Sequence, residues 1–131
     1  MSQEAAENAI WSLVPDLFLR VRLEGLARAA GVPLRSFAAP TALVTALAEI
    51  PEATARPRLV LLDLHSRDDA AFTLLAALAA RDGAPPTLGF HSHVDVAIRE
   101  RAVAAGCSRV VPRSALMNRF AALVAEVRAP A

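Results

Sequence analysis

The stretch Arg58–Leu64, RLVLLDL, is the part of the sequence that decides the fold. It is a nearly continuous apolar run, and a Pro-rich segment, Pro51–Pro57, comes before it. Continuous rather than alternating apolarity is typical of a parallel strand that is covered on both faces. The stretch therefore predicts a central strand of a parallel sheet, with Asp63 near the end of that strand.

Strand-like and helix-like patterns alternate on both sides of this stretch. Short apolar runs predict strands at Ala9–Val14, Leu34–Ala38, Thr87–His91 and Arg109–Val111. Apolar residues at helical spacing predict helices at Asp16–Ala30, Thr41–Ile50, Asp69–Arg81, Val94–Ala105 and Ala115–Arg128. Thr41 and Ser114 are the expected N-caps of the second and last helices, because a hydroxyl can accept a bond from a free helix N–H.

This order of elements determines the fold class. A strand followed by a helix, five times over, predicts an α/β fold with a parallel sheet and helices on both faces. Right-handed crossovers and short connections leave few arrangements of the strands. We predict a flavodoxin-like (βα)5 doubly wound sheet with strand order 2-1-3-4-5, two helices on one face and three on the other.

Length and composition are consistent with one ordinary domain. The 131 residues are 55% hydrophobic and carry a formal net charge of +1, which favours a single domain spanning residues 1–131 and excludes disorder. We expect residues 1–8 to form a flexible N-terminal segment. The scattered basic residues argue against nucleic acid as a partner, and the lack of a long apolar run argues against a membrane. A single cysteine and a polar, acidic N-terminus favour a cytoplasmic location.

The residues that could carry chemistry follow the strands. In open α/β sheets, ligands bind beyond the carboxyl ends of the strands. In this sequence those ends lie at Val14–Asp16, Asp63–Arg67, His91–His93 and Pro112–Ser114. We expect the functional site among these four segments.

Two stretches resemble the receiver domains of response regulators. RLVLLDL is similar to the third strand of the family, and Asp63 stands where the family has its phosphoacceptor aspartate. AGCSRVVPRSALMNRF, Ala105–Phe120, is similar to the fifth strand and the start of the last helix. Gly106 is followed seven positions later by Arg113, where the family has its lysine. The resemblance covers roughly Ala9 to Val127.

The rest of the family's phosphorylation machinery is altered. The acid pair after the first strand reads Val14–Pro15, with Asp16 one place later, and His91 stands at the position of the family's Thr or Ser. The resemblance therefore implies a stand-alone pseudo-receiver: a signalling adaptor without catalytic residues or cofactor. The alternative is an active receiver that binds Mg²⁺ and accepts a phosphoryl group on Asp63 from a histidine kinase.

The same reasoning yields expectations for the site and for partners. We expect Arg113 to lie within salt-bridge reach of Asp63 and to take the place of the family's lysine. The expected partners are other signalling proteins, and the family's fourth helix, fifth strand and fifth helix suggest a homodimer face. Met117 and Val124, which lie off the apolar stripe of the last helix, are expected to extend that face.

A metal site is a weaker alternative. His65, His91 and His93 could reach one edge of the sheet together with Asp63 and Asp95, and imidazole and carboxylate groups suit Zn²⁺. The spacing of these residues matches no zinc signature. The structure must show whether they converge.

Overall fold

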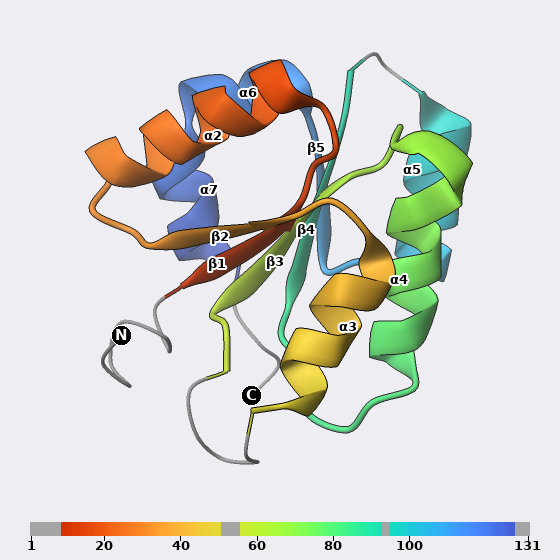
Figure 1. The fold of residues 1–131 in the computed structure, drawn as a ribbon. Helices are drawn as coiled ribbons and strands as arrows, with labels where there is room; N and C mark the ends of the chain where they lie inside the picture. The colour runs from red at the N-terminus through yellow and green to blue at the C-terminus, as the bar shows by residue number, and fades with distance from the viewer. Residues whose placement is uncertain (1–8, 51–55, 93–94, 128–131) are drawn as a thin grey trace.

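A computed structural model describes residues 9–50, 56–92 and 95–127 and shows one five-stranded parallel sheet (Figure 1). The strands lie in the order β2-β1-β3-β4-β5. Their bounds are β1 Ile10–Leu13, β2 Leu34–Phe37, β3 Leu59–Asp63, β4 Thr87–His91 and β5 Arg109–Pro112. All four strand pairings are parallel, so the predicted fold class and strand order are confirmed. The expected N-terminal segment, residues 1–8, lies outside the described residues.

Helices cover both faces of the sheet (Figure 1). One face carries α2 (Leu17–Ala29), α6 (Arg113–Asn118) and α7 (Phe120–Glu126), and the other carries α3 (Pro40–Ala48), α4 (Ala70–Ala79) and α5 (Val96–Ala104). A single turn of 3₁₀ helix, η1 (Arg67–Asp69), precedes α4. The predicted division of two helices against three is confirmed, with the last predicted helix present as α6 and α7. No helix among the described residues is long and apolar enough to span a bilayer.

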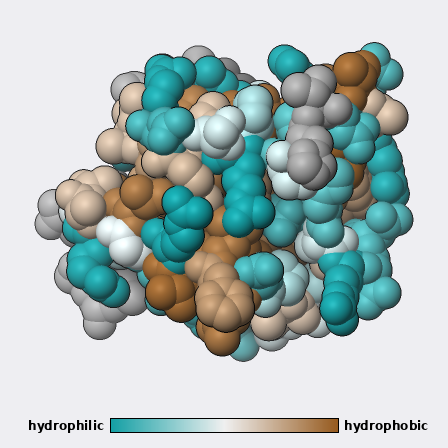
Figure 2. All heavy atoms as spheres, turned by 90° about the horizontal axis from the view of Figure 1, so that it is seen from above, coloured by the Kyte–Doolittle hydropathy of each residue, from teal (hydrophilic) through white to brown (hydrophobic). Residues whose placement is uncertain are grey.

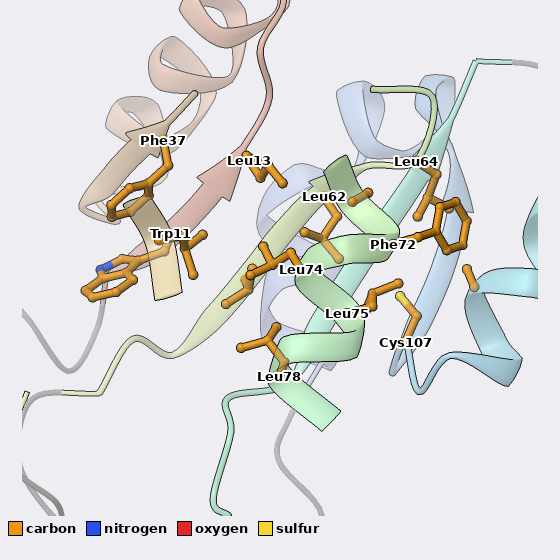
Figure 3. Packing of buried hydrophobic residues seen from close by; sticks show 14 of the residues in the cluster. Trp11, Leu13, Phe37, Leu62, Leu64, Phe72, Leu74, Leu75, Leu78 and Cys107 are labelled. Carbon is orange, nitrogen blue, oxygen red and sulfur yellow. The ribbon is translucent and has the colours of Figure 1, made fainter. Parts of the chain in front are cut away.

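The sheet separates two apolar cores. Along β3, Val60 and Leu62 belong to the core under α3, α4 and α5, whereas Leu59 and Leu61 belong to the core under α2, α6 and α7. All four leucine and valine side chains are fully buried, which is why the sequence of this strand is continuously apolar. Figure 3 shows the first of these cores.

The junction of β3 and β4 is tightly packed. A Cβ built on Gly89 would lie 3.0 Å from Cδ2 and 3.1 Å from Cδ1 of Leu64, the residue after Asp63. Glycine at this position of β4 therefore leaves room for a buried leucine directly beside the end of β3. Glycine is usually unfavourable inside a strand, and at position 89 this contact gives it a packing reason.

Helix starts were the least accurate part of the prediction. The N-cap of α3 is Ala39, with Pro40 as the first helical residue, so Thr41 is not the cap. Proline is favoured at the first helical position because its missing N–H would have no partner there. Ser114 is not a cap either, because α6 begins at Arg113 after Pro112.

The last helix is also interrupted. Arg119 has φ −132° and ψ 33°, and this non-helical residue separates α6 from α7. Val124 lies in the core beneath α2, where it is 2% exposed, and Met117 packs partly buried against the same core. The prediction that these residues extend an exposed face is therefore wrong for Val124, and Met117 keeps only part of its side chain exposed.

Candidate functional site

A hollow of about 420 Å³ lies at the carboxyl ends of β1 and β3. It is lined by residues from the loops after these two strands: Pro15, Asp16, Asp63, His65, Ser66 and Arg67. The structure thus brings together two of the four segments in which the sequence placed the site. We call this hollow the Asp63 pocket.

Asp63 is the last residue of β3 and is partly buried. Its Oδ1 accepts the backbone N–H of His65 at 3.0 Å. Burial raises the pKa of this carboxyl above its usual value, and the nearby charge of Asp16 also raises it; the bond from His65 and the positive charges of His65 and Arg113 act in the opposite direction. Because the effect of burial is the largest of these, the surroundings of Asp63 favour its neutral form more than water does.

Asp16 lies in the pocket but also has a structural task. It is the N-cap of α2, and its Oδ1 accepts the backbone N–H of Leu19 at 2.8 Å. Such a bond satisfies one of the free N–H groups in the first turn of a helix. The helix predicted to begin at Asp16 has Asp16 as its N-cap and Leu17 as its first residue, and the same side chain lines the pocket together with Asp63.

The residue that follows the last paired residue of β1 is a valine and not an acid. β1 and β3 are paired up to Leu13 and Leu62, and Val14 and Asp63 are the next residues along the two strands. The Val14 side chain is fully buried in the core beneath α2. Asp16 is consequently the only acid that the described part of the β1–α2 loop contributes to the pocket.

His91 and Arg113 do not complete the site. His91 ends β4 opposite Pro112, is 4% exposed, and is not among the residues that line the pocket. Arg113 is partly buried at the start of α6, but none of the ion pairs between described residues joins it to Asp63. The predicted salt bridge is therefore wrong, and Arg113 acts on Asp63 only through its more distant charge, which lowers the pKa of the carboxyl.

The loop after Asp63 is held by contacts that the sequence analysis missed. Asp68 and Asp69 have φ values of 57° and 53°, a left-handed conformation that aspartate tolerates better than most residues. The two terminal guanidinium nitrogens of Arg101 in α5, Nη1 and Nη2, donate to the Asp69 carboxylate at 3.2 and 3.0 Å. The same guanidinium lies 3.8 Å from the ring centroid of Phe72 in α4. Arg101 thus connects the site loop to α5.

Further bonds restrain the same loop. Ser66 Oγ accepts the backbone N–H of Ala71, which fixes the loop to the first turn of α4. The hydrogen bond from Arg101 lowers the pKa of Asp69, and the charge of Arg101 lowers it further. The sequence signal for this arrangement was the pair of consecutive aspartates before α4, because two left-handed residues in a row are rarely tolerated by other side chains.

The donor set of the pocket consists of two carboxylates, Asp16 and Asp63, beside His65 and Arg67. Among the described residues no group of three or more His, Cys, Asp and Glu side chains could hold a metal, and His93 lies outside them. Mg²⁺ is usually bound by one or two carboxylates and keeps several waters. Here one oxygen of Asp16 and one of Asp63 already accept a backbone N–H. The described residues therefore offer this ion two carboxylates, each with one oxygen already in a hydrogen bond.

Comparisons with known proteins place the fold. No protein-family model matches the sequence, and no curated protein matches it either. Among solved structures, the chain is similar to a response regulator receiver protein from Burkholderia phymatum, with 23% identity, a TM-score of 0.72, and coverage of 94% of this chain and 98% of that one.

Two further solved structures are similar over comparable lengths. A putative response regulator from Chloroflexus aurantiacus has 16% identity and a TM-score of 0.75, with coverage of 91% of this chain and 98% of that one. The phosphorylated cyanobacterial phytochrome response regulator RcpA has 16% identity and a TM-score of 0.68, with coverage of 90% and 89%. Together with the strand order and the position of Asp63 at the end of β3, these likenesses show that the chain has the fold of response-regulator receiver domains.

Proposed function

We propose that this chain is a degenerate receiver domain of a two-component signalling system, which acts by binding other signalling proteins rather than by accepting a phosphoryl group on Asp63. The observation that carries the proposal is that Val14, the residue after the last paired residue of β1, is buried in the core and contributes no acid to the pocket. With valine at that position, the described residues contribute two carboxylates to the pocket, and one of them caps α2. Fold alone does not carry an activity, so the residues of the site must decide.

The electrostatics of the pocket support the same conclusion. Phosphoryl transfer needs cations that neutralise the charge developing on the transferred group. Arg113 forms no ion pair with Asp63, and its planar fork is not equivalent to the compact charge of a lysine ammonium. The sequence contains no lysine at all, so no other residue of this chain could supply that ammonium.

The second candidate is a receiver that is still phosphorylated on Asp63. It is favoured by the open pocket, which both Asp16 and Asp63 line and to which Ser66 and Arg67 add a hydroxyl and a positive charge. One structural neighbour was solved in its phosphorylated form, although at 16% identity. In this candidate a histidine kinase would be the phosphoryl donor, and Mg²⁺ would be required.

A magnesium titration followed by ¹H–¹⁵N NMR separates the two candidates. We expect no saturable shifts for the amides of Asp16, Asp63 and His65, because the carboxylates are partly committed to backbone N–H groups. Saturable shifts at these amides that disappear in Asp63→Asn would favour the phosphorylatable receiver. Asp95→Asn is a suitable control, since Asp95 is also a helix-capping aspartate but does not line the pocket.

A further inference from the structure

The outward face of α2 is apolar and has no partner within the described chain. Leu19, Leu23 and Ala27 turn into the core, whereas Leu17 and Val21 on the opposite side are each 57% exposed. Phe18 beside them is 84% exposed, the highest value among the exposed large hydrophobic side chains of the described residues. A helix that is apolar on both sides is typical of one that is covered on both sides.

Small residues continue this face toward the end of the helix. Gly25 and Ala29 follow Leu17 and Val21 at intervals of four residues, and both are exposed. A Cβ on Gly25 would meet nothing within 4 Å, so no contact inside the chain requires glycine there. Glycine in a helix interior is unfavourable by roughly 0.5–1 kcal/mol relative to alanine. Its presence on an exposed face is explained if another backbone or a bulky side chain approaches closely.

The face is complementary to itself in the antiparallel direction. Its first half carries the large side chains and its second half the small ones. In an antiparallel pair centred on the middle of α2, Leu17 lies opposite Ala29 of the second copy and Val21 opposite Gly25. Phe18 lies opposite Arg28 of the second copy, which allows a guanidinium to contact an aromatic ring. Large side chains therefore meet small ones on both sides of the twofold axis.

We propose that two copies of this chain associate through α2, with the two helices antiparallel around a twofold axis. The distribution of charge favours this occupant over an unrelated helix. In the register that places Val21 opposite Gly25, the exposed Arg22 of one copy lies opposite Glu24 of the other, and Asp16 at the start of one helix approaches Arg28 in the last turn of the other. The proposal does not depend on whether Asp63 is phosphorylated.

Figure 2 is a view onto the carboxyl ends of the strands, from above the molecule as it is drawn in Figure 1. Hydrophobic side chains reach the surface on the side of α2, and the side of α5 is mainly hydrophilic. Among the described residues, α2 has three exposed large hydrophobic side chains, whereas α5 has two, Val96 and Val103. The α2 face is therefore a better candidate for self-association than α5, which corresponds to the fourth helix of the receiver family.

The dimer should be weak, because α2 is short. Its 13 residues span about 20 Å, and one helix pair of this length gives a contact in the small, transient class of interfaces. Sedimentation equilibrium of the full chain over a wide concentration range should show a reversible monomer–dimer equilibrium in the micromolar to millimolar range. A chain that stays monomeric at all concentrations would overturn the proposal.

Matched substitutions locate the interface. Phe18→Arg should weaken the dimer at least about tenfold, because it removes a buried aromatic anchor and faces Arg28 of the second copy. Val103→Arg is the control, since it introduces the same charge at an exposed apolar position of α5 and should leave the dissociation constant unchanged. A dimer that Val103→Arg abolishes and Phe18→Arg leaves intact would contradict the assignment to α2.

The double variant Phe18→Arg with Arg28→Glu tests the antiparallel register. It should recover a large part of the lost association, because the introduced guanidinium of one copy and the introduced carboxylate of the other would then face each other across the axis. Gly25→Leu should have opposite effects on the monomer and on the dimer. It should raise the melting temperature of the monomer, since leucine favours helix, and it should weaken the dimer by filling the space opposite Val21. Failure of the charge swap to restore association, or a tighter dimer in Gly25→Leu, would contradict this packing.

Discussion

Two glycines of the α2 region should respond in opposite ways to the same substitution. Gly25 lies inside the helix with open space around a built Cβ, and Gly31 lies just after the helix with φ of 71° and the same open space. An added Cβ would therefore meet no neighbouring atom at either position, and the two glycines differ only in their backbone conformation. Gly25→Ala removes the entropic disadvantage of glycine in a helix and should stabilise the monomer by roughly 0.5–1 kcal/mol. Gly31→Ala places a Cβ in the left-handed region and should destabilise it by about 1 kcal/mol.

These values translate into measurable melting shifts. Unfolding entropy of about 2.1 cal/mol/K per residue gives about 0.28 kcal/mol/K for a chain of 131 residues, so 1 kcal/mol shifts the Tm by about 4 °C. Circular dichroism melts at low protein concentration, where the proposed dimer is dissociated, should place Gly25→Ala above and Gly31→Ala below the unsubstituted chain. A lower Tm for Gly25→Ala would refute the reasoning, because it would mean that this glycine is required within the monomer.

Three further outcomes follow from the site and its surroundings. Burial raises the pKa of Asp63 in the folded chain, so the carboxyl ionises more easily in the unfolded chain, and its contribution to stability falls as pH rises through the folded pKa. Urea unfolding at neutral pH should therefore find Asp63→Asn more stable than the unsubstituted chain, with the difference vanishing toward acid. A less stable variant at neutral pH would contradict the desolvation argument. Gly89→Ala should lower the free energy of unfolding by about 1–3 kcal/mol, because its Cβ would meet Leu64 at 3.0 Å. The loss should be smaller in a Leu64→Ala background, and strictly additive losses would show that the two residues do not share this contact. Arg101→Ala should speed amide hydrogen exchange at Asp69 and its neighbours, because the paired hydrogen bonds from the guanidinium are lost. Arg101→Lys should exchange as fast as Arg101→Ala, since lysine cannot form the paired bonds. Unchanged exchange in Arg101→Ala would mean that Arg101 does not hold the loop.

The sequence predicts the sheet well because its signals are local and repeated. The apolar run at β3 and the alternation of strands and helices were sufficient for the strand order. The position of Asp63 at the end of β3 follows from the same pattern. Capping was harder, because several residues near a helix start can serve as a cap. The choice of Ala39 over Thr41 is made by Pro40, which fits the first helical position.

The site was predicted less completely, for a physical reason. Two of the expected residues, Asp16 and Asp63, do line one pocket, since parallel strands bring their carboxyl ends together. The ion pair of Asp63 with Arg113 does not form, because a long side chain at a helix start can take many directions and the sequence pattern does not select one. The contact between Arg101 and Asp69 joins residues 32 positions apart and depends on the left-handed turn before α4. No short-range pattern encodes such a contact.

The central claim is that Asp63 no longer accepts a phosphoryl group, and incubation with acetyl phosphate and Mg²⁺ followed by intact-mass spectrometry tests it most directly. The absence of lysine is helpful here, because acetyl phosphate cannot acetylate a lysine side chain in this chain and the mass spectrum is simpler to interpret. We predict no stable adduct of one phosphoryl group, with Asp63→Asn giving the same spectrum as the unsubstituted chain. A mass increase of one phosphoryl group that is lost in Asp63→Asn would contradict the claim and identify the chain as an active receiver.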